Sequence, residues 1–271
     1  YDNDPISRIE GIVNGSTNYI LTKVAEKGLS FADALKEAQA NGFAESDPRL
    51  DVQGYDASFK LSILLTHAFG LRVKPEQIVR VGIDRLSDHD LAFARSHGYR
   101  IKLVAGGYRQ GSEVYAWVAP KLIPPGDPLF GIKDAFNAVR VEGLFAEEQL
   151  FIGKGAGGNP TGSAVLSDVS ALRYNYRYEF RKSATVHRLA YSCQAVVSVR
   201  VGCLPGTRIS PLDFVQFQGG VRTKDWHQLE GDISLEVFAE WSSRNDISLV
   251  LSPGALARPW KPVKQNELEA A

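Results

Sequence analysis

One stretch of the chain places several acidic side chains ahead of a single lysine. Residues 44–61 read AESDPRLDVQGYDASFKL. Asp56 and Lys60 are four positions apart, so on a helix they would lie on the same face. Most other side chains on that face are apolar, and a partly buried lysine gives up its proton more readily, which suits acid/base chemistry. The alternative is an ordinary surface ion pair, worth only about 0.3–0.5 kcal/mol on a helix.

Three more carboxylates precede this pair, in a segment that Pro48 interrupts. They belong to Glu45, Asp47 and Asp51. One interpretation is a solvated acidic loop whose carboxylates cap the neighbouring helices. The other is a pocket for a cationic group, such as the ammonium of an amino acid. A calcium site is not expected, because the segment lacks the spacing and the final glutamate of an EF-hand.

A glycine-rich segment, GKGAGGNPTG at residues 153–162, is a second candidate site. Gly153, Gly155 and Gly158 fit the G-x-G-x-x-G pattern of dinucleotide-binding proteins. Pro160 would however lie at the start of the helix that should follow, and no second strand ending in an acid follows about 20 residues later. We therefore interpret the segment as a loop whose backbone can approach a ligand closely.

Three helices are expected before residue 70 to position these candidates. Hydrophobic periodicity predicts them over residues 17–28, 31–42 and 56–70. Ser16 is the expected cap of the first and Ser30 of the second. Asp56 and Lys60 then lie in the first turns of the third helix.

Beyond residue 100 the apolar period changes to two, which indicates strands. Residues 100–123 predict a hairpin, and 136–143 and 148–153 predict two more strands. The fold class is therefore α+β, with helices packed on a mixed sheet. The chain beyond residue 175 is less regular.

Three strand candidates occur in that last part, at residues 195–201, 233–241 and 247–251.

Composition sets the broad class of the protein. The chain has 271 residues, 44% of them hydrophobic, enough for one large or two smaller domains. Lys+Arg and Asp+Glu both number 31, so no overall field favours nucleic acid or an acidic membrane. Two cysteines make no disulfide framework, which favours a reducing compartment. No signal peptide is visible, and no apolar run approaches the length of about 20 residues that a membrane span needs.

Two further observations concern the ends and the metals. The chain starts at Tyr1 and contains no methionine, which indicates a processed or partial chain. Its five histidines are scattered, and none pairs with another histidine or a cysteine at metal-ligand spacing, so no metal site is expected.

Three motifs together carry a resemblance to a known family. RIEGIVNGSTNYIL, FADALKEAQANGFAESDPRLDVQGYDASFKLSIL and GKGAGGNPTGSAVLSDV occur in this order, and their spacing resembles that of homoserine dehydrogenases. The resemblance implies a substrate-binding, catalytic and dimerisation domain at residues 1–175. Residues 176–271 would be a C-terminal extension, with a divergent regulatory module of the amino-acid-sensing (ACT) kind as the alternative.

The resemblance also implies an activity and its partners. Members interconvert L-homoserine and L-aspartate 4-semialdehyde with NAD or NADP, on the route to threonine, isoleucine and methionine. A cytoplasmic homodimer is implied. The nucleotide-binding domain, and a monovalent cation site, would lie upstream of this chain. The alternative is a non-catalytic fragment that only dimerises or binds an amino acid.

The family's functional residues fall on defined positions of this sequence. Its Asn-Gly-Thr motif becomes Asn14, Gly15 and Ser16, so that serine replaces threonine and the hydroxyl is kept. The resemblance implies catalytic roles for Lys60 and Asp56. The implied substrate-binding residues are Glu45, Asp51, Gly15 and Ser16. The implied contacts to the nicotinamide come from Gly153, Gly155, Ala156 and Gly157.

Overall fold

The computed structural model describes residues 4–176, 189–254 and 258–259. A mixed sheet runs through the molecule. The strands of its first part are β1 (Ile6–Ile12), β2 (Val79–Arg80), β3 (Arg100–Gln110), β4 (Glu113–Ile123), β5 (Phe136–Gly143) and β6 (Glu148–Lys154). The helices associated with them are α1 (Gly15–Lys27), α2 (Phe31–Ala40), α3 (Arg49–Val52), α4 (Tyr55–Phe69) and α5 (Asp88–Ser96).

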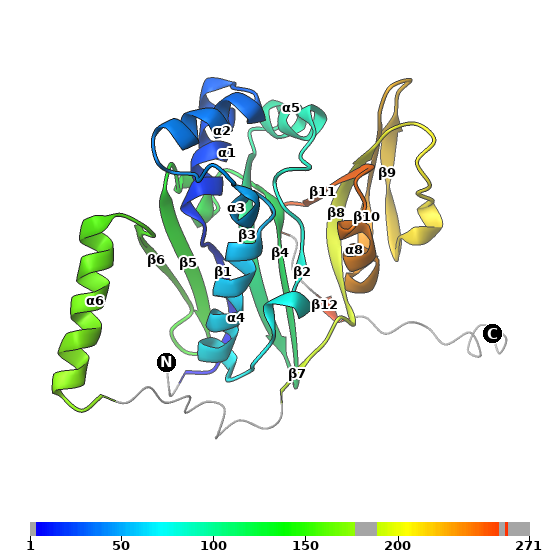
Figure 1. Cartoon of the computed structure of the whole chain (residues 1–271). Helices are drawn as coiled ribbons and strands as arrows, with labels where there is room; N and C mark the ends of the chain where they lie inside the picture. Colours follow the sequence, from blue (N-terminus) through cyan, green and yellow to red (C-terminus); the bar gives the residue numbers. More distant parts are fainter. Residues whose placement is uncertain (1–3, 177–188, 255–257, 260–271) are drawn as a thin grey trace, which may run out of the picture.

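The helices lie over the sheet as the sequence predicts. Strands β6, β5, β1, β3 and β4 are neighbours in that order, and α1 and α4 contact β3. Figure 1 shows α1 to α5 gathered over this part of the sheet. The predicted α+β class, with helices packed on a mixed sheet, is confirmed. The predicted hairpin is also present, and Gly111 at its turn has φ +60°, a conformation that favours glycine.

The core between α4 and the sheet fixes the distance of that helix from the sheet. Leu61 and Leu65 are fully buried one turn apart, on the face of α4 that points at β3. A Cβ on Gly107 would lie 2.5 Å from Leu65 Cδ2, so only glycine lets the helix pack this closely on the strand. Asp56 and Lys60 are carried by the same helix and are therefore fixed relative to the sheet.

The first helix begins two residues earlier than predicted. Its cap is Asn14, whose side chain accepts a hydrogen bond of 2.9 Å from the Thr17 amide. The prediction of Ser16 as the cap was wrong. Asn14 has the extended backbone that a cap needs, whereas Ser16 already lies in the first helical turn.

Strand β1 was missed by the sequence analysis, although it lies in the middle of the sheet between β3 and β5. One of its residues, Glu10, is fully buried. The carboxylate is paired with Lys121 of β4 and Arg140 of β5, which are themselves buried. A charged side chain at a core position conceals the apolar alternation by which a strand is recognised.

Lys102 of β3 is a further buried charge, with a testable consequence. Its Nζ donates hydrogen bonds of 2.7 Å to Asn18 Oδ1 and to the Ile132 carbonyl, and burial lowers the pKa of Lys102 to about 7. In the unfolded chain the group titrates near its usual pKa of 10.5. Between these values the unfolded state binds more protons, so this residue makes stability rise with pH.

We therefore expect the free energy of unfolding of Lys102→Met, compared with that of wild type, to be higher at about pH 6 than at about pH 9. The reason is that only wild type carries the cost of burying a charge at low pH. In the variant, Asn18 Oδ1 and the Ile132 carbonyl lose their hydrogen-bond donor at every pH, which changes the free energy of unfolding by the same amount at both pH values. Urea unfolding at both pH values measures the difference. A difference in unfolding free energy that does not change with pH would contradict the expectation.

The C-terminal part is more regular than predicted. It contains β8 (Ala195–Cys203), β9 (Gln216–Arg222), β10 (His227–Ser234), α8 (Leu235–Ser242) and β11 (Ile247–Leu251). The strands lie in the order β11-β8-β10-β9, all neighbours antiparallel, and α8 connects β10 to β11. This is the arrangement of a ferredoxin-like split βαβ unit, with the first helix reduced to the short turn η3 (Pro211–Asp213).

The predicted strand at residues 233–241 is wrong, because most of that segment is helix α8. Ser234 ends β10 and caps the helix by accepting a hydrogen bond of 3.1 Å from the Val237 amide. Leu235, Phe238 and Trp241 then face inward at helical spacing. The strands predicted at 195–201 and 247–251 are confirmed as β8 and β11.

The remaining connections are short. Where the two parts of the sheet meet, β11 pairs with β4 in parallel at one ladder position, Leu251 with Lys121. Short strands β7 (Ala190–Tyr191) and β12 (Arg258–Pro259) pair with β4 and β8 respectively. Within the described residues, no helix has both the length and the apolar character needed to cross a bilayer.

Candidate active site

Asp51, Asp56 and Lys60 meet around a single asparagine at the start of α1. Asn14 Nδ2 donates to Asp51 Oδ1 at 2.7 Å and to Asp56 Oδ2 at 2.8 Å. Lys60 Nζ donates to the same Asp56 oxygen at 2.7 Å and to the carbonyl of Val13 at 3.0 Å. We call Asn14, Asp51, Asp56 and Lys60 the lysine cluster. The predicted pairing of Asp56 with Lys60 is present, and it is part of a larger arrangement.

The lysine cluster is anchored but open to solvent. The side chains of Lys60 and Asp56 are 42% and 30% exposed. A lysine ammonium has three N–H donors, and two of them are taken by Asp56 and the Val13 carbonyl. The third is available to a ligand. An isolated surface ion pair would not be held at a backbone carbonyl as well, so the geometry favours a site over that alternative.

A glycine turn brings the two carboxylates to the same asparagine. Gly54 separates α3 from α4 and has φ +77° and ψ +14°, a left-handed conformation that favours glycine. A Cβ at this position would also lie 3.2–3.3 Å from side-chain atoms of Arg80 and Val118. The sharp reversal places Asp51 at the end of one helix beside Asp56 at the start of the next.

Gly15 and Ser16 lie in the first turn of α1, directly after Asn14. A Cβ on Gly15 would lie 3.0 Å from the carbonyl oxygen of Ala135, so the helix start packs tightly against the segment that enters β5. Ser16 is partly exposed. Both residues therefore lie within two positions of Asn14, a member of the lysine cluster.

The acidic residues before Pro48 are less closely connected. Glu45 is exposed, and among the described residues no hydrogen bond or ion pair joins its carboxylate to the lysine cluster. Its backbone carbonyl accepts a hydrogen bond of 2.9 Å from Gln39 Nε2. Asp47 pairs with Arg49 at 2.6 Å, and the Arg49 hydrogen bonds lower the pKa of Asp47 to about 2. The solvated-loop interpretation thus describes Asp47.

The glycine loop, residues 153–158, joins β6 to helix α6 (Gly158–Arg173) and is exposed. Gly157 has φ +121° and ψ +151°, a region accessible in practice only to glycine. Strand β6 is the edge of the sheet and is antiparallel to β5. A dinucleotide fingerprint requires a parallel βαβ unit, so the prediction that this is a different kind of loop agrees with the fold.

Comparison with known proteins identifies the family. The family model described as homoserine dehydrogenase matches residues 1–170. The chain belongs to the homoserine dehydrogenase family. The homoserine dehydrogenase of Bacillus subtilis (strain 168) is 42% identical over 174 residues, which are 64% of this chain and 40% of that protein. That of Mycobacterium tuberculosis (strain H37Rv) is 44% identical over 171 residues, 61% of this chain and 39% of its own length.

Solved homoserine dehydrogenases share the fold over most of the chain. The structure from Thiobacillus denitrificans has a TM-score of 0.75 and 28% identity, covering 92% of this chain and 64% of that one. The Staphylococcus aureus enzyme at pH 6.5 has a TM-score of 0.69 and 28% identity, covering 94% and 66%. The chain spans about 40% of the length of the curated homoserine dehydrogenases it matches.

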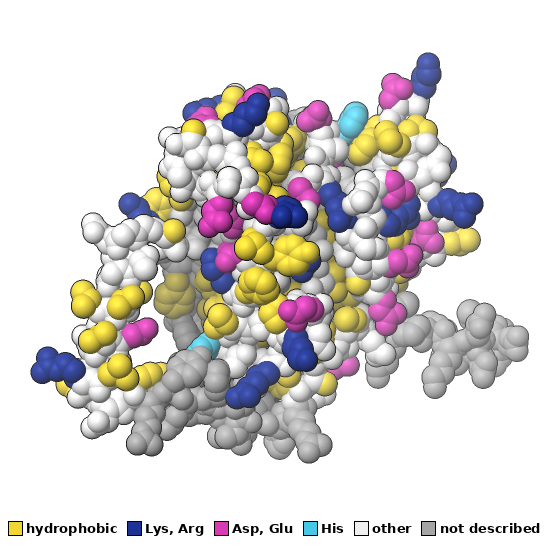
Figure 2. Space-filling model, in the orientation of Figure 1, with side chains coloured by type: hydrophobic (Ala, Val, Ile, Leu, Met, Phe, Trp, Pro, Cys, Tyr) yellow, Lys and Arg dark blue, Asp and Glu magenta, His cyan; other side chains and the backbone are white. Residues whose placement is uncertain are grey.

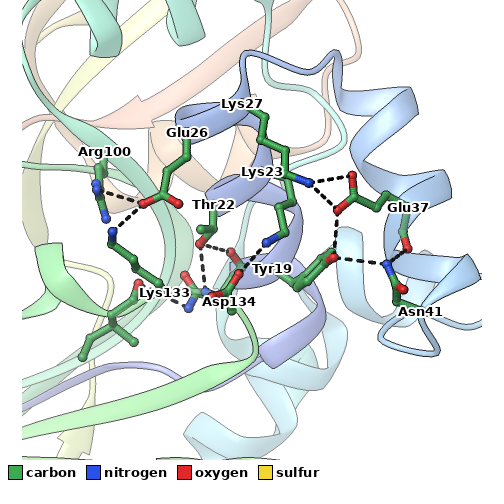
Figure 3. A network of polar contacts seen from close by, with 12 residues as sticks. Tyr19, Thr22, Lys23, Glu26, Lys27, Glu37, Asn41, Arg100, Lys133 and Asp134 are labelled. Atoms are coloured by element: carbon green, nitrogen blue, oxygen red, sulfur yellow. Dashed lines mark hydrogen bonds and ion pairs between the residues drawn. The ribbon is translucent and has the colours of Figure 1, made fainter.

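Ion pairs along the later turns of α1, beyond the turn that carries the lysine cluster, fix this helix in the fold. Figure 3 shows side chains of α1 reaching to both sides. Lys27 pairs with Glu37 of α2 at 2.9 Å, and Lys23 pairs with Asp134 at 2.7 Å; the latter hydrogen bond raises the pKa of Lys23. Glu26 pairs with Lys133 at 2.6 Å. These contacts fix the helix that carries Asn14 at the lysine cluster.

The sequence contains Asn14 in a recognisable motif but does not predict its contacts with the two carboxylates. An asparagine just before an apolar-periodic segment is a recognisable helix cap, and that signal was present. Its bonds to Asp51 and Asp56 depend on the turn at Gly54 and on the packing of two helices, which no local pattern reports.

Proposed function

We propose that this chain is the substrate-binding and catalytic part of an NAD- or NADP-dependent homoserine dehydrogenase in the cytoplasm. It would interconvert L-homoserine and L-aspartate 4-semialdehyde in the synthesis of threonine, isoleucine and methionine. The observation that carries the proposal is Lys60, held by Asp56 and the Val13 carbonyl with one N–H left for a ligand. An oxygen at C4 of the substrate is a suitable partner for that donor.

The lysine cluster supplies both binding and proton transfer in this proposal. Asp51 has a second oxygen beyond the one bonded to Asn14 and, with Glu45, binds the substrate ammonium. During oxidation Lys60, as the neutral amine, accepts the proton of the C4 hydroxyl, and in the reverse direction its ammonium returns that proton to the oxygen at C4. Asp56 keeps Nζ of Lys60 aimed at that oxygen.

The glycine loop fits the cofactor that the family name suggests. Gly155 has no room for a Cβ and Gly157 has a glycine-only conformation, so the exposed loop can lie directly against a flat ring. Gly153, Gly155, Ala156 and Gly157 would contact the nicotinamide, which when bound accepts a hydride from C4. One relative in the family was solved in complex with NADPH. We propose that a nucleotide-binding domain outside these 271 residues holds the rest of the cofactor.

Kinetics of two acidic variants tests the proposed roles, in the full protein with its nucleotide-binding domain. We expect Glu45→Ala mainly to raise KM for homoserine, because it removes ground-state binding of the ammonium. Asp56→Ala should mainly lower kcat, because Lys60 loses its side-chain partner. Asp47→Ala is the matched control, since that carboxylate is already paired with Arg49. Equal effects of all three variants on KM would refute this division of roles.

A homodimer is proposed for the protein, as the family resemblance implies. The strand segment 114–119 is buried within the single chain and leaves no apolar face there. Exposed apolar side chains occur instead on β6 and α6, and Figure 2 shows hydrophobic side chains along α6. Large exposed apolar patches commonly mark surfaces that bind another protein. Sedimentation velocity should show a dimer at micromolar concentration; a monomer would contradict the proposal.

We further propose that residues 1–175 and 176–271 are separate units of the chain. The distinct strand order of the second part supports this division, as does the fact that β11 pairs with β4 in the sheet ladder at a single position. A complete four-stranded arrangement favours a module with its own role, such as regulation, over a purely structural extension. Residues 177–188, at the boundary, lie outside the described part of the chain.

A further inference from the structure

Asn137 lies between the glycine loop and the carbonyl that holds Lys60. It is the second residue of β5 and pairs with Gly153 at the end of β6. Its Nδ2 donates to the carbonyl oxygen of Val13 at 3.4 Å. The same oxygen accepts the 3.0 Å hydrogen bond from Lys60 Nζ. One backbone carbonyl is therefore shared by the lysine and the Asn137 carboxamide.

The glycine loop touches Asn137 at Gly155. A Cβ on Gly155 would lie 2.8 Å from Asn137 Cγ and still closer to Nδ2, well inside van der Waals contact. The neighbouring glycines differ: a Cβ on Gly153 would meet nothing within 4 Å, and one on Gly157 would meet only Pro160. Of these three loop positions, only Gly155 packs against a side chain outside the loop.

The other end of the Asn137 carboxamide is not satisfied. Its Oδ1 is buried and has no hydrogen-bond partner among the described residues. Exchanging the two amide atoms would not help, because it would turn an oxygen toward the Val13 carbonyl in place of the donor. A buried acceptor without a donor is uncommon in folded proteins, and it is expected where a donor arrives with a ligand or a loop movement.

We propose that Asn137 is a positioning residue that couples the place of the glycine loop to the place of Lys60, an inference that rests on the proposed function. A shift of the loop at Gly155 moves the carboxamide, the carboxamide moves against the Val13 carbonyl, and that carbonyl holds the ammonium. When the loop closes on a nicotinamide, a backbone N–H of the loop supplies the donor that Oδ1 lacks. Lys60 is then fully positioned only when the cofactor site is occupied.

Steric relief tests the coupling. In the full protein, Gly155→Ala should push the carboxamide aside and lower kcat by about 10²-fold, the usual cost of an ångström of misplacement at a reacting group. Asn137→Ala should lower kcat by about 10-fold, with KM for homoserine little changed. In the double variant the alanine at 137 makes room for the new Cβ, so its kcat should match that of Asn137→Ala and exceed that of Gly155→Ala. Gly131→Ala, where a Cβ meets nothing within 4 Å, is the control.

The outcomes separate this inference from the function on which it rests. Recovery of kcat in the double variant supports the coupling; a double variant whose loss equals the product of the single losses overturns it, since independent sites combine in that way. If Gly155→Ala does not fold, Asn137→Ala alone decides, and a change in KM without a change in kcat overturns the proposal. Wild-type protein that fails to oxidise homoserine refutes the proposed function, and the coupling with it.

Discussion

Replacing Lys60 by alanine should lower kcat for homoserine oxidation by about 10²–10⁴-fold, the usual contribution of a positioned acid/base group. The proton of the C4 hydroxyl would lose its acceptor, while Glu45 and Asp51 would still bind the ammonium, so KM should change much less. Steady-state kinetics on the protein with its nucleotide-binding domain measures both constants.

Lys36→Ala is the matched control, because Lys36 is exposed on α2, away from the lysine cluster. Its kinetics should equal those of wild type. The surface-ion-pair interpretation makes the opposite forecast for Lys60→Ala: a stability change below about 1 kcal/mol and intact turnover. Near-normal turnover in a folded Lys60→Ala protein would refute the mechanism even though the family assignment stood.

Replacing Glu10 by glutamine should reduce the free energy of unfolding by about 3–5 kcal/mol, the cost of leaving a buried charge without its partner. The carboxylate is the shared partner of two buried cations, Lys121 and Arg140. Glutamine keeps the shape of the side chain and removes the charge. Urea unfolding measures the loss, and Glu76→Gln on an exposed turn is the control.

The effect of Glu10→Gln should depend on pH. Burial acts to raise the pKa of Glu10, but the charges of Lys121 and Arg140 outweigh it and hold that pKa below the usual 4.5. An acid with a lowered pKa stabilises the fold fully above its unfolded pKa, and this stabilisation is lost as pH falls through the folded value. The gap between wild type and variant should therefore be largest near neutral pH and shrink below pH 4.5. A constant gap would show that packing, rather than charge, is what the glutamate contributes.

The helices and the hairpin were predictable because their apolar residues repeat at the period of the element, as Leu61 and Leu65 do in α4. Strand β1 and helix α8 are among the elements that were not predicted. Strand β1 carries a buried Glu10 in place of an apolar residue, and its charge is balanced only by strands far away in sequence. Residues 233–241 have apolar side chains at every second position, which fits a strand, and also at every third, which fits a helix. The cap at Ser234 decides between the two, and its effect is local enough to have been used.

The candidate site was predictable in its residue types and only partly in its geometry. The spacing of Asp56 and Lys60 predicts their contact, and it is present. The convergence of Asp51 and Asp56 on Asn14 is a tertiary property, because it requires α1, α3 and α4 to end or begin at one place. Asn137 had no signal at all in the sequence, since its importance lies in what surrounds it.

The oxygen that holds Lys60 belongs to the backbone, and this has a consequence for how the protein can vary. Any residue at position 13 presents the same carbonyl, so selection for the anchor leaves no mark on the side chain of Val13. The constraint falls instead on residues that fix the path of β1. Gly11 is one: a Cβ there would lie 3.1 Å from the Cα of Val139 and closer to the carbonyl of Ala138. In comparisons of homologous sequences, we therefore expect glycine to be retained at position 11, two residues before the carbonyl that binds Lys60, while the side chain at position 13 varies.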